Sequence, residues 1–126
     1  MFKVTIWQRG WAEPSGDNFL DKELVKKLAG RKRCYADVFY DMSVQVIPQV
    51  GTYFQCTARG KYNNVLMGNV QQIFHKVDRL YDDLFHHTYK IQLENEKKGL
   101  TKHWEKYAYE DEHFHLVWLP WHADED

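Results

Sequence analysis

The chain has 126 residues, the size of one ordinary domain, and its formal net charge of -1 excludes the global basic field of a general nucleic-acid binder. Aromatic residues make up 16% of it, more than a core requires, which predicts that some rings lie on a binding surface. The chain begins without the long apolar run of a signal peptide and contains no segment with the composition of a membrane span. We therefore expect a cytoplasmic protein that has no membrane segment.

The first quarter of the chain is predicted to form a strand and a short helix. Residues 2–8 alternate between apolar and polar side chains, which is the pattern of a half-buried strand. A loop rich in glycine, proline and serine follows. Asp17 or Asn18 is then expected to cap a helix over residues 19–30, which ends at Gly30.

The next segment is predicted to form a β-hairpin. Residues 34–46 alternate with a period of two, residues 47–52 have the composition of a turn, and residues 52–60 form the return strand. In this register Cys56 lies too far along the sheet from Cys34 for a disulfide. Both cysteines are on apolar faces, so we expect two free core thiols in a reducing compartment.

The clearest helical pattern lies in residues 70–85. Apolar side chains recur there at spacings of three and four, which predicts a long amphipathic helix with Phe74 and Leu84 in the core. The same helical reading places four polar side chains on the opposite face. They are His75, Asp78, Asp82 and His86, and a solvated helix face is their simplest interpretation, with metal binding as the alternative.

The remaining elements complete a prediction of the fold. Residues 88–112 are assigned to an insertion, residues 113–119 to a last strand, and residues from about 122 to 126 to an acidic tail. The order β-α-β-β-α-(insertion)-β predicts a single α+β domain over residues 1–126, with an antiparallel sheet covered by helices on one face. A ferredoxin-like arrangement fits this order, and a different α+β topology is the competing one.

The alternation of the strands places a second set of side chains on the uncovered sheet face. The candidate partner-binding residues carry large rings or guanidinium groups: Trp7, Arg9, Tyr35, Phe39, Tyr53, Arg59 and Trp121. Residues of these types dominate protein–protein hot spots, and they also stack on unpaired bases. The structural alternative is that the insertion folds over this face and buries it as a second core layer.

The near-neutral charge favours a protein partner or self-association over nucleic acid. There is no glycine-rich phosphate loop, no GxSxG and no CxxC. The sequence thus predicts a small cofactor-free binding protein of the inhibitor, adaptor or accessory type, such as mobile elements carry. A single-stranded nucleic-acid binder that uses the same face is one alternative.

The second alternative is an enzyme. His113-Phe114-His115 is similar to the His–hydrophobic–His pattern of the HUH endonucleases. The resemblance implies that His113 and His115 hold a divalent metal, which polarises a phosphate for attack by a tyrosine. The usual tyrosine on a later helix is missing, so Tyr107 or Tyr109 would have to act from upstream. A structural strand without metal is the prediction that we favour for this segment.

Overall fold

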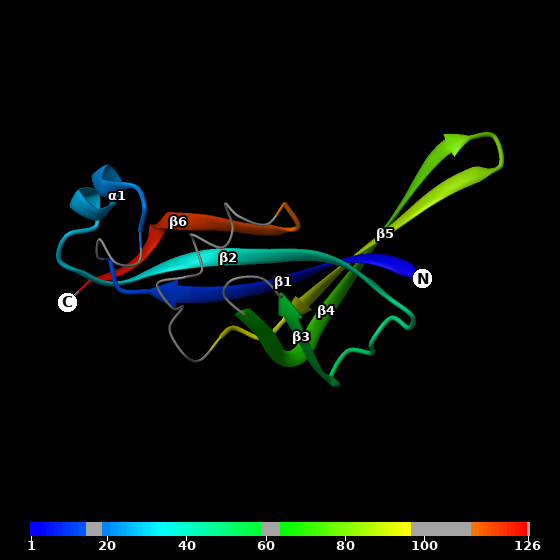
Figure 1. Ribbon diagram of the computed structural model, residues 1–126, viewed down its shortest axis with the longest axis horizontal. Helices are drawn as coiled ribbons and strands as arrows, with labels where there is room; N and C mark the ends of the chain where they lie inside the picture. The colour runs from blue at the N-terminus through cyan, green and yellow to red at the C-terminus, as the bar shows by residue number, and fades with distance from the viewer. Residues whose placement is uncertain (15–18, 59–63, 97–111, 126) are drawn as a thin grey trace.

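In the part of the chain that the structure describes, all but one of the regular elements are strands, and they form one sheet (Figure 1). The computed structural model describes residues 1–14, 19–58, 64–96 and 112–125, with side chains except at 58, 64 and 120–125. The elements are β1 (Phe2–Ala12), α1 (Lys22–Lys27), β2 (Arg31–Val44), β3 (Tyr53–Ala58), β4 (Asn64–Tyr81), β5 (Leu84–Leu93) and β6 (Phe114–Glu125). The strand order is β3-β4-β5-β1-β2-β6, and every pair is antiparallel except the parallel pair of β1 and β5.

The predicted α+β fold with helices on one sheet face is wrong. The described structure is 68% strand and 6% helical, and one six-stranded mixed sheet replaces the ferredoxin-like arrangement. The predicted strands near both ends of the chain are confirmed as β1 and β6. That residues 1–126 form a single domain stays a prediction.

The predicted long helix over residues 70–85 is the largest error, because this segment is a β-hairpin made of β4 and β5. Its register shifts between Val70 and Gln72, so that Val70 and Ile73 both face the core although they are three residues apart. The bulge therefore gives two core-facing residues of a strand the three-residue spacing that is typical of a helix. Phe74 and Leu84 are 41% and 51% exposed, so the prediction that they are core residues is also wrong.

The predicted hairpin of residues 34–46 and 52–60 is wrong in its pairing. Each segment contains a strand, β2 up to Val44 and β3 over Tyr53–Ala58, and a turn at Gly51 precedes the second, where the Thr52 amide donates to the carbonyl of Gln49. However, β3 pairs with β4, so Cys56 lies opposite Leu66. The strand β2 pairs instead with β1 and β6.

The core lies on one face of the sheet, and a bend in β4 covers it. The N-terminal part of β4 pairs with β3, and in Figure 1 this pair lies below β1 and β2 in the view. Cys56 and Leu66 from this pair belong to the same buried cluster as Ile6 and Val38. The core is therefore closed by strands of the same sheet, and no helix of the described residues covers it.

A buried polar contact joins β1 to β4 and to the residue that follows β5. Gln8 is 3% exposed, and its Nε2 donates to the carbonyls of Met67 at 2.7 Å and Glu94 at 2.9 Å. Gly68 lies beside this contact with a φ of +154°, and a Cβ on it would approach Cγ of Glu94 to 2.8 Å. The positive φ of Gly68 and its close approach to Glu94 thus require glycine at this position.

The helix α1 lies at one end of the sheet (Figure 1). Its N-cap is Asp21, whose carboxylate accepts hydrogen bonds from the amides of Glu23 and Leu24. The sequence analysis predicted Asp17 or Asn18 as the cap, and both lie outside the described residues. Gly30, with a φ of +86°, follows the helix as predicted. A small second cluster packs beneath it: Phe19, Leu24, Val25, Leu28, Cys34 and Trp118.

The prediction that both cysteines are core residues is confirmed, since Cys34 and Cys56 are buried and free. Desolvation raises the pKa of each thiol from 9.0 to about 11, against a smaller lowering by backbone hydrogen bonds. Between pH 9 and pH 11 the native thiols keep protons that the unfolded chain releases. Their contribution to the free energy of unfolding is therefore fully present below pH 9 and is lost as pH rises towards 11.

We therefore expect the free energy of unfolding to fall over this pH range more steeply in the wild type than in the double variant Cys34→Ala/Cys56→Ala. Urea unfolding at several pH values in the presence of reductant measures both slopes. Equal slopes would contradict the assignment of buried, proton-retaining thiols.

Candidate functional site

The face of the sheet opposite the core carries a cluster of aromatic rings, which we call the outer-face cluster: Trp7, Phe39 and Phe74. Trp7 of β1 and Phe39 of β2 are direct cross-strand partners, and their rings stack with centroids 6.1 Å apart and an interplanar angle of 19°. Phe74 of β4 lies on the other side of Trp7, with its ring centroid at 6.3 Å. Three strands thus contribute to one aromatic surface centred on Trp7.

A lysine lies over this cluster. Lys90 of β5 places its Nζ 5.6 Å from the ring centroid of Trp7 and 5.8 Å from that of Phe39. Both distances are within the range of cation–π attraction. The ammonium group adds a positive charge at the centre of an otherwise apolar surface.

Two further arrangements continue the outer face along β1 and β2. Arg9 and Asp37 form an ion pair, in which Nε donates to Oδ1 at 2.9 Å and the guanidinium makes a second contact to Oδ2 at 3.3 Å. Beyond this pair, the guanidinium of Arg33 lies 4.2 Å from the ring centroid of Trp11. The Arg9 charge is therefore compensated within the protein.

A polar group lies at the other side of the cluster. The hydroxyl of Thr5 donates to Oδ1 of Asp41 at 2.6 Å, and Nε2 of His115 lies 3.6 Å from Oδ2 of the same carboxylate. His115 is the cross-strand partner of Phe39. Asp41 thus holds a threonine from β1 and a histidine from β6 beside the aromatic rings.

The structure brings together four of the seven predicted partner-binding residues. Trp7, Arg9, Tyr35 and Phe39 all lie on the outer face, because the predicted alternation is correct in β1 and in residues 34–44, whereas β2 ends at Val44 and Val46 is exposed. Tyr53 is 59% exposed on β3, with β4 and β5 between it and β1, so it does not join them.

The last two of the seven are not placed. Arg59 lies outside the described residues. Trp121 belongs to β6, but its side chain is outside the described part of the structure. Their roles stay predictions.

The two histidines of the sequence prediction contact different carboxylates. His113 is exposed in the turn before β6, where its Nε2 lies 3.3 Å from Glu112, whereas His115 contacts Asp41. Within the described ranges no group of three or more His, Cys, Asp or Glu side chains could hold a metal ion. Tyr107 and Tyr109 lie outside those ranges.

The proposed stripe of His75, Asp78, Asp82 and His86 does not form, since its helix is a hairpin. Asp78 lies opposite His86 across β4 and β5, whereas His75 lies opposite Tyr89 and makes a 2.9 Å contact with His87. The four side chains therefore do not share one face.

Sequence reasoning missed Phe74 and Lys90. Phe74 was assigned to a helix, and residues around Lys90 to an ambiguous insertion. The alternation of "TYKIQL" at 88–93, with Ile91 and Leu93 buried, was the available signal for a strand that exposes Lys90 on the opposite face.

No family model matches the chain, and the searches of curated proteins and of solved structures found no significant match. The residues of the structure itself therefore carry the functional argument. Among the helices of the described residues, none has the length and apolar character needed to cross a membrane.

Proposed function

We propose that this chain is a small binding protein of the cytoplasm, which recognises a protein partner through the outer-face cluster and Lys90. The observation that carries the proposal is the convergence of three rings and one ammonium group from four strands on a single surface. Rigid aromatic side chains bury much area at a low entropy cost, and together with charged anchors they dominate the energetics of protein interfaces.

The charges around the cluster favour protein over nucleic acid. Arg9 is paired with Asp37, and Asp41 adds a second carboxylate on the same face. Nucleic-acid binding depends on uncompensated basic groups that neutralise phosphates, and carboxylates on the face oppose it. A mixed surface of rings and both signs of charge suits the polar rim and apolar centre of a protein interface.

The test compares the binding of one protein partner to matched variants. Proteins captured by the tagged chain from its native cell are quantified for the wild type, Trp7→Ala, Lys90→Glu and Tyr53→Ala. We then expect the captured partner, once purified, to bind Trp7→Ala at least about 30-fold more weakly, which corresponds to loss of a hot-spot residue. Isothermal titration calorimetry gives the dissociation constants.

Tyr53→Ala is the control, because it removes an exposed aromatic ring that lies away from the cluster. It is expected to bind like the wild type. Lys90→Glu reverses the charge over the rings and leaves the rings themselves in place, so it separates a binding defect from a folding defect. A partner that binds Trp7→Ala and Lys90→Glu as tightly as the wild type would contradict the proposal.

A further inference from the structure

The hairpin of β4 and β5 extends beyond the other strands as a two-stranded ribbon, which we call the arm: residues 76–81 of β4 and 84–88 of β5 (Figure 1). The strand β3 pairs with β4 only as far as Asn69, and β1 pairs with β5 only from Tyr89 onward. Within the described residues, each strand of the arm therefore has one edge without a neighbouring strand. A lone two-stranded ribbon is only marginally stable in water.

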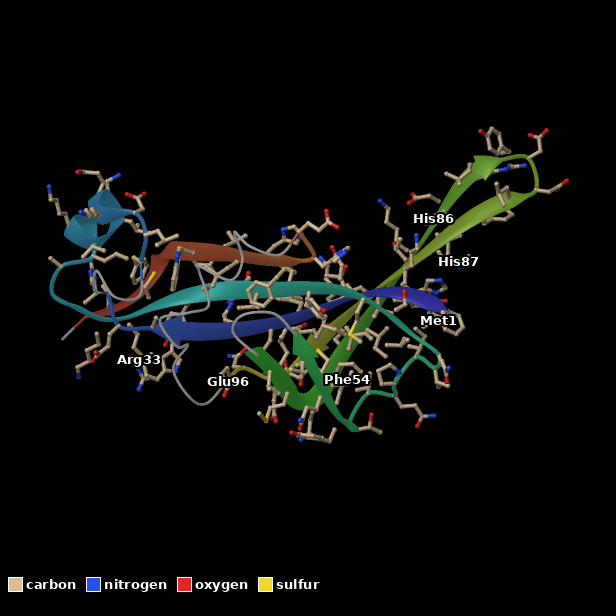
Figure 2. All side chains as sticks on the ribbon, viewed as in Figure 1. Met1, Arg33, Phe54, His86, His87 and Glu96 are labelled. Atoms are coloured by element: carbon tan, nitrogen blue, oxygen red, sulfur yellow. The ribbon has the colours of Figure 1, made fainter. Side chains whose placement is uncertain are left out.

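The arm also exposes apolar side chains, and Figure 2 shows its side chains extending to both sides of the ribbon. The large exposed ones, between 47% and 74% accessible, are Val77, Leu80, Tyr81, Leu84 and Phe85. Open strand edges with apolar side chains are the features through which sheets pair with another chain. The open edge of β4 runs from residue 71 to residue 81 and is longer than the open edge of β5.

The order of charges along this edge favours a second copy of the same strand. Lys76 and Asp78 are two residues apart, so they project from the same side of β4, and they lie before the register shift between Arg79 and Tyr81. An antiparallel pair with two-fold symmetry has its axis at one residue, which lies opposite itself. With the axis at Val77, each Lys76 lies opposite the Asp78 of the other copy.

The neighbouring registers lack this complementarity. An axis at Asp78 places the two Asp78 carboxylates opposite each other, and an axis at Lys76 places the two ammonium groups opposite each other. Like charges directly opposite across a strand pair are destabilising, whereas opposite charges and apolar pairs stabilise it. Charges on an edge usually prevent pairing, but here they permit one register and oppose its neighbours.

We propose that two copies of this chain associate through the open edges of β4, in antiparallel register about a two-fold axis at Val77. The ion pairs between Lys76 and Asp78 of the two copies replace the exposed contact of 3.6 Å that these side chains make within one strand. This dimer goes beyond the proposed recognition of a protein partner and does not depend on it.

Charge reversal tests the register. Lys76→Glu places two carboxylates opposite each other at both crossings, and Asp78→Lys does the same with two ammonium groups, so each single variant is expected to weaken the dimer roughly tenfold or more. An equimolar mixture of the two single variants has opposite charges at both crossings and is expected to associate like the wild type. Sedimentation velocity over a concentration series measures association, and native mass spectrometry identifies the mixed dimer.

The double variant Lys76→Glu/Asp78→Lys restores opposite charges within one chain, so it should form dimers as the wild type does. Far-UV circular dichroism verifies the fold of each variant, and Val77→Glu provides a second disruption at the axis itself. A wild type that stays monomeric at the highest attainable concentration would overturn the proposal, as would single variants with wild-type association or a mixture without mixed dimers. Trp7→Ala should leave the dimer unchanged, so failure of the outer-face proposal is distinguishable from failure of this one.

Discussion

Replacing Phe114 by alanine is expected to destabilise the protein by about 3–5 kcal/mol, the usual cost of removing a buried phenyl ring. Phe114 is 0% exposed, lies opposite Tyr40 of β2 and belongs to the main core cluster. The surrounding strands are fixed by their ladders of hydrogen bonds, so they cannot collapse fully into the vacated space. Urea unfolding at neutral pH gives the free energy directly.

The matched control lies on the same strand. Val117 is 48% exposed on β6, and Val117→Ala is expected to change the free energy of unfolding by no more than about 0.5 kcal/mol. A larger loss from Val117→Ala than from Phe114→Ala would show that β6 presents its side chains in the opposite phase. That result would also remove His115 from the outer face.

Gln8→Leu is the second change with a large expected effect. It removes the two hydrogen bonds that join β1 to Met67 of β4 and to Glu94 after β5. Each of the two part-buried hydrogen bonds contributes about 0.5–1.5 kcal/mol net, so we expect a loss of about 1–3 kcal/mol. Thermal and chemical unfolding both measure it.

Gln72→Leu makes the same chemical change on the exposed side of β4, opposite Gln92, and is expected to leave stability almost unchanged. Hydrogen exchange adds a local readout, since Gln8→Leu should increase the exchange of amides in residues 64–69 more than elsewhere. Uniform exchange changes over the whole sheet would contradict a specific role for Gln8 in joining β1 to β4.

The strands at the two ends of the chain were predictable from sequence because apolar and polar side chains alternate without interruption over residues 2–8 and 113–116. Ile6 and Trp7 lie on opposite faces as the period of two requires, and so do Phe114 and His115. The prediction that Trp7, Arg9 and Phe39 share one sheet face followed directly from this alternation. Local periodicity was sufficient wherever one face is buried and the other is not.

The hairpin of β4 and β5 was not predictable in the same way, for three physical reasons. Its bulge after Val70 gives a strand the spacing of a helix, and its projecting arm has apolar side chains on both faces, which removes the alternation. Its turn, Asp82-Asp83, lacks the glycine that marks most two-residue hairpin turns. The pairing of β3 was missed with it, because strand neighbours depend on contacts distant in sequence.

The place of β1 in the middle of the sheet has a consequence for how the chain folds during synthesis. β2 follows within the first 44 residues and can pair with β1 locally, but the other neighbour of β1 is complete only at Leu93. At a synthesis rate of 5–20 residues per second, the interval from Ala12 to Leu93 lasts roughly 4–16 s. During that interval Val4 and Ile6 lack the strand that pairs beside them. We therefore expect slow folding, typical of sheets closed by distant strands, and nascent chains that depend on chaperones to protect this central strand.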